Sequence, residues 1–76
     1  MEKKKLADME YGEKGVVVHI DTELKNKVAG MGIRAGKELI FTTQHPIKGP
    51  VVVEVEGSTT SMGIGIAEKI MVEVEA

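Results

Sequence analysis

The chain is most constrained between Val28 and Gly36, where the sequence Val-Ala-Gly-Met-Gly-Ile-Arg-Ala-Gly predicts a helix end, a turn and the start of a strand. Gly32 stands where the end of a helix needs a residue at positive φ, a conformation that glycine adopts without a Cβ penalty. Ile33 then occupies the position at which a Schellman motif packs an apolar residue against Val28. Gly36 precedes the β-rich run 37–43, so one short helix lies between strands. This plan favours a small barrel over an enzyme.

Short runs of β-branched and apolar residues predict four further strands, at 16–20, 51–56, 58–62 and 70–75. Because side chains alternate between the two faces of a strand, we expect three inward-facing sets: Val16, Val18 and Ile20; Val51, Val53 and Val55; Ile70, Val72 and Val74. Val17 and His19 are expected to point outward, and residues 63–69 to form a turn or a single helical turn. Together with 37–43, these runs make five short strands that we expect to close on one another and leave no long exposed edge.

The helix is expected from Thr22 to Met31, with Asp21 as its N-terminal cap. A carboxylate at that position accepts backbone N–H groups of the first turn and suits the positive end of the helix dipole. Leu24, Val28 and Met31 are spaced i, i+4 and i+7 and form one apolar stripe. A helix this short is not stable alone, so burial of the stripe must hold it.

Composition restricts the class of protein. With 76 residues, of which 42% are hydrophobic, we expect a single domain over residues 1–76. The chain has no cysteine, which excludes disulfides, thiolate metal sites and cysteine nucleophiles. The net charge is −2, and the one basic run, Lys3–Lys5, is interpreted as a solvated end rather than a nucleic-acid arm. No apolar run approaches a membrane span and no signal peptide follows Met1, so we expect a cytoplasmic protein without direct membrane insertion.

No arrangement of residues suggests catalysis, and we expect that the protein is not an enzyme. Ser58 and Ser61 have no partnered histidine. Residues 57–61 lack the Gly-Lys-Ser/Thr ending of a phosphate-binding loop, and residues 63–66 lack the strand–turn–helix setting of a dinucleotide fingerprint.

His19 and Asp21 are the candidate metal ligands, because their i, i+2 spacing at a strand end places them on one face. Fe²⁺ accepts imidazole and carboxylate ligands, and His45 is the one other histidine of the sequence. However, Asp21 has a structural use as a helix cap, and an outward histidine on a strand is ordinarily solvated. The cap-and-solvent interpretation is favoured, so we expect no cofactor and at most weak binding of a divalent metal such as Fe²⁺.

Several segments, taken in order, resemble the FeoA family, the small cytoplasmic component of bacterial ferrous-iron uptake systems. Residues 6–9 (Leu-Ala-Asp-Met) and 12–15 (Gly-Glu-Lys-Gly) are similar to the family's opening Leu-x-x-Leu and Gly-x-x-Gly turn. Residues 28–36 resemble its central signature, in which an apolar pair leads into Met/Leu-Gly-Leu/Ile-x-x-Gly. The match covers about residues 6–74, since two further segments agree: the loop with Pro46 and Pro50, and Ala67-Glu68-Lys69-Ile70.

The resemblance implies a mostly β fold, a small SH3-like barrel of about five strands with one short α-helix inserted after the first strand. The C-terminal domain of iron-dependent repressors has the same fold, so the fold alone does not fix the function. One departure is visible at residues 63–66, where many members carry charged residues and this chain has Gly-Ile-Gly-Ile. This difference suggests a more apolar or more flexible surface.

Binding is the function that remains for a small barrel without chemistry of its own. Ile64 and Ile66, with Met62 and Ile33, are candidates for an exposed apolar patch that a partner covers. The alternative is that Ile66 and Met62 seal the end of the barrel. Ile64, isolated between two glycines, is the better candidate for exposure.

Two functions are compatible with these features. The resemblance implies a non-enzymatic accessory protein that binds the cytoplasmic G-protein (GTPase) domain of a ferrous-iron transporter. The alternative is an SH3-like regulatory or scaffold module of the repressor type, which binds a peptide or a protein domain. RNA binding is disfavoured by the acidic balance and by the presence of only two aromatic residues. Weak self-association into a homo-oligomer stays open.

Overall fold

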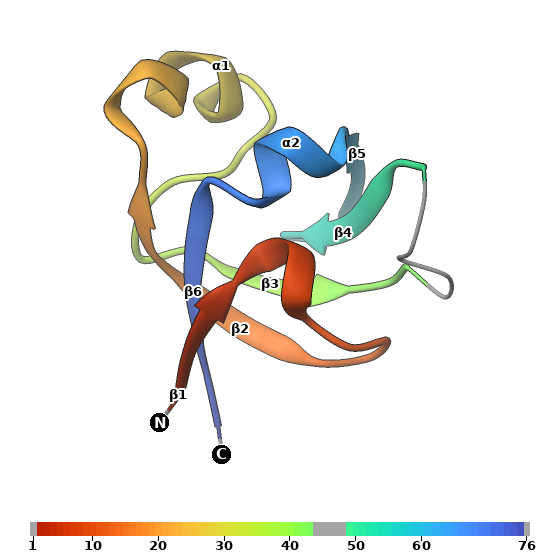
Figure 1. Cartoon of the computed structure of the whole chain (residues 1–76). Coiled ribbons are helices and arrows are strands. Elements are labelled where there is room, and N and C mark those ends of the chain that lie inside the picture. Colours follow the sequence, from red (N-terminus) through yellow and green to blue (C-terminus); the bar gives the residue numbers. More distant parts are fainter. Residues whose placement is uncertain (1, 44–48, 76) are drawn as a thin grey trace.

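The computed structural model describes residues 2–43 and 49–75, which form one antiparallel sheet with short helices at its ends (Figure 1). The strands are β1 (Glu2–Lys5), β2 (Lys14–Ile20), β3 (Glu38–Phe41), β4 (Val51–Val55), β5 (Ser58–Met62) and β6 (Ile70–Val74). Their order in the sheet is β1-β6-β2-β3-β4-β5, and all neighbours are antiparallel. The helical elements are η1 (Leu6–Asp8), η2 (Thr22–Leu24), α1 (Lys25–Ala29) and α2 (Ile64–Ala67). The expected mostly β fold is confirmed.

Strand β1 was not expected, because its sequence Glu-Lys-Lys-Lys has no apolar alternation. It pairs with β6 from Glu2 opposite Val74 to Lys5 opposite Met71, so the lysine run is an edge strand rather than a loose solvated end. Its presence makes six strands instead of five, and the helix α1 follows the second strand, not the first. The sheet is also open rather than closed, since β1 and β5 are its two edges.

The inward faces of β4 and β6 are as expected, with all six predicted residues buried. In β2 the expectation was wrong in part. Val17 is buried, with 1% of its surface exposed, whereas Val16 is only half-buried and Val18 is 37% exposed. Ile20 is again buried, as predicted.

A β-bulge in β2 explains this change of face. Val17 is opposite Val72 of β6, but the next paired residue, His19, is opposite Met71. Val18 is therefore the extra residue of the bulge, which bends the strand and changes which side chains face the core. As a result Val18 and His19, which are neighbours, are both exposed.

The helix end has the geometry that the sequence predicted. Gly32 has φ of +85°, its N–H donates to the carbonyl of Ala29 at 3.0 Å, and the Ile33 N–H donates to the carbonyl of Val28 at 3.0 Å. These are the two hydrogen bonds of a Schellman motif. Val28 and Ile33 belong to the same buried core, and Gly36 also has a positive φ, of +91°.

The start of the helical segment differs from the expectation. The segment 22–29 is divided into a 3₁₀ turn (η2) and α1, and Asp21 makes no side-chain capping bond to either. The Asp21 carboxylate instead has an oxygen 3.8 Å from Nε2 of His19. The apolar stripe is confirmed, since Val28 is fully buried and Leu24 and Met31 pack against the core.

The core lies between the sheet and the short helices and is made almost entirely of aliphatic side chains, with Phe41 as its one aromatic residue. Leu6 and Met9, in and after η1, cover one end of it. The β4–β5 hairpin turns at Glu56 and Gly57, whose φ angles of 51° and 81° are those of a type I′ turn. The predicted loop at 44–50 lies mostly outside the described residues.

Candidate functional site

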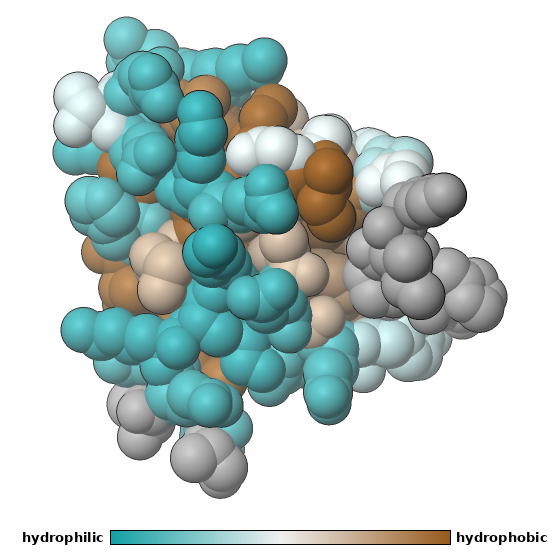
Figure 2. All heavy atoms as spheres, in the orientation of Figure 1, coloured by the Kyte–Doolittle hydropathy of each residue, from teal (hydrophilic) through white to brown (hydrophobic). Residues whose placement is uncertain are grey.

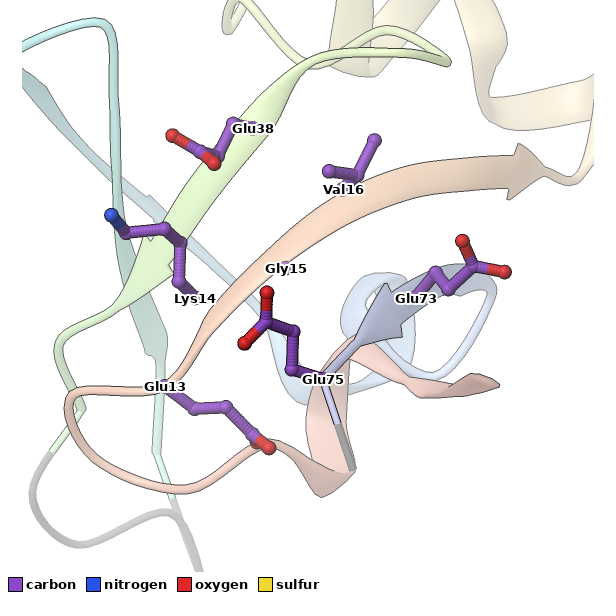
Figure 3. A pocket seen from close by; sticks show the side chains of 7 residues that line it. All are labelled: Glu13, Lys14, Gly15, Val16, Glu38, Glu73 and Glu75. Atoms are coloured by element: carbon purple, nitrogen blue, oxygen red, sulfur yellow. The ribbon is translucent and has the colours of Figure 1, made fainter. Parts of the chain in front are cut away.

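Two hollows in the surface of the described residues differ in charge. The first, called here the acidic hollow, has a volume of about 400 Å³ and lies over β2 and its neighbours β3 and β6 (Figure 3). Its lining consists of Glu13, Lys14, Gly15, Val16, Glu38, Glu73 and Glu75. Figure 3 shows the four carboxylates spread around the hollow rather than converging on one point.

The acidic hollow is not a candidate metal centre. Within residues 2–43 and 49–75, no three side chains of the His, Cys, Asp or Glu type are placed to hold one ion. One of its carboxylates is already engaged, since Lys4 Nζ lies 3.2 Å from Oε1 of Glu13 and the Glu10 N–H donates to the same oxygen at 3.0 Å. The hollow is best described as the charged outer face of the sheet.

The second hollow, called here the basic groove, has a volume of about 370 Å³. It lies between the second half of β2, the helix α1 and the segment 33–35 that follows the helix. Its lining consists of Val18, His19, Ile20, Lys25, Asn26, Ala29, Ile33, Arg34 and Ala35. The floor is apolar, and among the described residues the ionisable groups of the lining are all basic, with no carboxylate.

One ionisable group in the described part of the chain has a clearly altered acidity. The ammonium group of Lys37, the residue before β3, hydrogen-bonds to the carboxylate of Glu56 in the β4–β5 turn, and this bond and the positive charge of Lys37 lower the pKa of Glu56. Arg34 adds a smaller effect in the same direction. Both partners of the pair are well exposed, so this interaction contributes little to stability.

Of the four residues expected to form a partner-binding patch, Ile64 is exposed, at 38%, and Ile66 is half-buried against the core. Met62 and Ile33 are 4% and 1% exposed and belong to the core. Their side chains therefore offer no surface to a partner, because β5 turns Met62 inward and the Schellman motif does the same for Ile33. Ile64 and Ile66 both lie on α2, but two positions apart on a helix they face different directions, so of these four residues Ile64 alone is exposed.

The candidate metal ligands His19 and Asp21 lie 3.8 Å apart and are open to solvent, with 66% and 45% of their side chains accessible. No third ligand joins them among the described residues. His45 lies outside the described residues. The pair is thus a solvent-exposed contact at the end of β2.

Sequence reasoning missed the basic groove, because its residues come from three separate segments. One signal was present in the sequence: the basic residues Lys25 and Arg34 flank the helix and its turn. These two basic residues indicate a binding groove only when the outward position of Val18, caused by the bulge, is known. Among the described residues, no helix is long and apolar enough to cross a bilayer.

Comparison with known proteins agrees with this architecture. The model of the FeoA domain family matches residues 4–74. A protein of Methanocaldococcus jannaschii, provisionally named Fe(2+) transport protein A, is 37% identical over 71 residues, which are 90% of this chain and 83% of that protein.

Solved structures extend the comparison to the fold. A crystal structure of an iron uptake regulatory protein (FeoA) superposes with a TM-score of 0.86 at 32% identity and covers 96% of this chain and 97% of that one. T. acidophilum IdeR shares the fold alone, with a TM-score of 0.83 at 20% identity, over 99% of this chain but 35% of that one. The SH3-like fold expected from the resemblance is thereby confirmed. From its family match, its sequence identity and its fold, the chain belongs to the FeoA family.

Proposed function

We propose that this protein is a non-enzymatic accessory component of ferrous-iron uptake, which acts in the cytoplasm by binding the GTPase region of the membrane iron transporter. Membership of the FeoA family and the name of the M. jannaschii relative support the link to Fe²⁺ transport. The observation that carries the contact itself is the exposed Ile64 on α2. In this proposal the transporter, not this chain, binds the nucleotide and conducts the ion.

Ile64 is held in a fixed position although it is exposed. In α2 the Ala67 N–H donates to the Gly63 carbonyl at 3.1 Å, and the Glu68 N–H donates to the Ile64 carbonyl at 2.9 Å. Ala67 is fully buried and Ile66 packs against the core, so these two side chains fix α2 to the rest of the protein. Holding the anchor in place before contact lowers the conformational entropy lost on binding.

The surroundings of Ile64 are open. An added Cβ at Gly63 or at Gly65 would meet no atom within 4 Å, so a partner can approach the backbone on both sides of the isoleucine. Figure 2 shows apolar atoms exposed on the part of the surface where α2 lies. An isolated aliphatic side chain with free space around it is suited to enter a pocket on a partner, where apolar anchors supply much of the binding energy.

The test is the substitution Ile64→Asp, measured by calorimetry with the purified cytoplasmic domain of the transporter. We expect the dissociation constant to rise at least about thirtyfold, equivalent to about 2 kcal/mol, because a charge would be desolvated in the contact. The midpoint of thermal unfolding should change little, since the site is exposed. Tyr11→Asp is the matched control, because Tyr11 is an exposed apolar residue in a distant turn, 63% accessible.

Two results would contradict this proposal. Binding that is unaltered by Ile64→Asp would remove Ile64 from the interface. Equal weakening by Tyr11→Asp would mean that added negative charge, not the loss of an apolar anchor, causes the effect.

The repressor-type alternative, an SH3-like regulatory or scaffold module, has the similarity to IdeR in its favour. That similarity covers 35% of the repressor chain and is a likeness of fold. If the transporter domain shows no binding to the unmodified protein, while a peptide or another protein domain does, this alternative replaces the first.

A further inference from the structure

We propose that the basic groove binds an acidic peptide segment of a partner protein, with one apolar side chain of that segment in the groove and its carboxylates on the rim. The groove shares no lining residue with α2, where Ile64 lies. The inference therefore concerns a second contact surface and does not depend on the identity of the partner proposed above.

The bulge in β2 gives the groove its apolar floor. Val18 has no partner residue on β6, and the bulge turns its side chain outward, to 37% exposure. Bulges next to binding sites commonly redirect a side chain in this way. The half-buried Ala29 adds to this exposed apolar surface, whereas Ile20 and Ile33, which are 5% and 1% exposed, belong to the core beneath it. An apolar side chain placed here would therefore lose water mainly against Val18 and Ala29.

The rim supplies the charge selectivity. Lys25 on α1, Arg34 after the helix and His19 on β2 all line the groove. Every ionisable group in the lining is basic, although the whole chain has a net charge of −2. A carboxylate of a bound segment is thus attracted from two directions, and the planar guanidinium group of Arg34 is suited to bind it with two hydrogen bonds.

Nearby carboxylates reduce the positive field but do not remove it. Asp21 is 3.8 Å from His19, and Glu56 is close enough to Arg34 for their charges to interact, yet neither lines the groove. Lys25 has no ion-pair partner among the described residues. The groove therefore keeps at least one unneutralised cation for a ligand.

The size of the groove selects a short segment of protein. Its volume of about 370 Å³ lies at the lower end of the range of small ligand sites, roughly 300–1,000 Å³, and holds one aliphatic side chain with part of the flanking backbone. The Asn26 amide, also in the lining, can donate to or accept from that backbone. In an extended segment with a leucine between acidic residues, the leucine would contact the apolar floor, the carboxylates would bind the basic rim, and the backbone would hydrogen-bond to the Asn26 amide.

The experiment is an NMR titration of the ¹⁵N-labelled protein with the acetylated, amidated peptide Asp-Glu-Leu-Asp-Glu at 50 mM NaCl. We expect the amide signals of Val18, Ala29 and Ala35 to shift in a saturable way. Binding should weaken at least tenfold when leucine is replaced by serine in the peptide, and should be lost for the peptide Lys-Arg-Leu-Lys-Arg. Raising NaCl to 500 mM should weaken binding severalfold, because exposed charges are screened.

Variants of the protein separate the groove from general electrostatics. Arg34→Glu and Lys25→Glu should each weaken binding at least tenfold. Lys27→Glu is the matched control, since Lys27 is exposed on the same helix but does not line the groove, and it should change binding less than threefold. Preserved dispersion of the amide spectrum shows that each variant is folded, and Arg34→Gln, which removes the charge without reversing it, should give an intermediate loss.

Equal effects of Lys25→Glu and Lys27→Glu would overturn the proposal, as would saturable shifts elsewhere than around the groove or equal binding of the serine peptide. The variant Ile64→Asp should bind the peptide normally. If that variant loses the transporter domain but keeps the peptide, the two surfaces are distinct. If the peptide does not bind while the transporter domain does, the result refutes only the proposal that the basic groove binds an acidic segment.

Discussion

Replacing Gly32 by valine tests the local rule that places the helix within this fold. Gly32 has φ of +85°, and an added Cβ there would meet no atom within 4 Å. A steric clash with the rest of the protein is therefore not expected, and the cost is conformational. An L-residue in the left-handed region is disfavoured by about 1–2 kcal/mol, and a β-branched one by up to about 3 kcal/mol.

The chain cannot avoid this cost by relaxing to a negative φ. Relaxation would break the two Schellman bonds, from Gly32 to Ala29 and from Ile33 to Val28, both 3.0 Å long. Each is worth about 0.5–1.5 kcal/mol, so the total is again about 1–3 kcal/mol. It would also separate Val28 from Ile33, both of which are buried in the core.

Urea denaturation of Gly32→Val should therefore show a loss of about 1–3 kcal/mol. With a slope of about 1 kcal/mol per molar urea for a domain this small, the midpoint should fall by about 1–3 M. The matched control is Gly30→Ala. Gly30 has φ of −65°, and its added Cβ would lie 3.5 Å from the Lys27 carbonyl oxygen, an ordinary contact. This variant should be neutral or more stable by up to about 1 kcal/mol, because alanine restricts the unfolded chain. An unchanged midpoint for Gly32→Val, or an equal loss for Gly30→Ala, would refute the argument.

Three further results are expected. Gly15→Val should lower the thermal midpoint more than Gly32→Val, because the new Cβ would lie 3.1 Å from Val74 Cγ1 and 3.2 Å from Met9 Cε in the core; a smaller loss would show that these neighbours move aside easily. In Lys37→Gln the pKa of Glu56, followed by ¹³C NMR, should rise toward its ordinary value. Because Lys37 lowers the pKa of Glu56 in the folded state, the small stabilisation by the pair is present at neutral pH and is lost as the pH falls through that pKa. The variant should therefore lack this pH-dependent loss of stability. Anaerobic calorimetry with Fe²⁺ should show no one-to-one site with a dissociation constant below about 1 μM, and a tighter site would restore a metal-binding role.

Local chemistry was enough to predict the helix end and several inward faces. The φ of Gly32 and the burial of Ile33 follow from a rule that acts over six consecutive residues. In β4 and β6, strict alternation of apolar and polar residues identified the buried side correctly. Ile64 was recognised as exposed because the two glycines beside it give it no covering neighbour.

Features that depend on a partner strand could not be predicted in this way. β1 has a charged sequence and becomes a strand because β6 offers an open edge for its backbone to pair with. The alternation in β2 suggested that Val18 faces inward, but the register with β6 inserts a bulge there and turns it outward. Asp21 has the residue type of a helix cap, yet its carboxylate lies near His19 and makes no capping bond.

The sequence by itself therefore determined the helix end, the family resemblance and the set of residues available for the core. Only the tertiary structure decided which apolar strand residues stay exposed, since Met62 is buried while Val18 is not. It also created the basic groove, by bringing Lys25 and Arg34 to the same side as the bulge. The physical reason is that turns and helix ends are governed by residues near in sequence, whereas strand register, burial and surface charge depend on contacts between segments far apart along the chain.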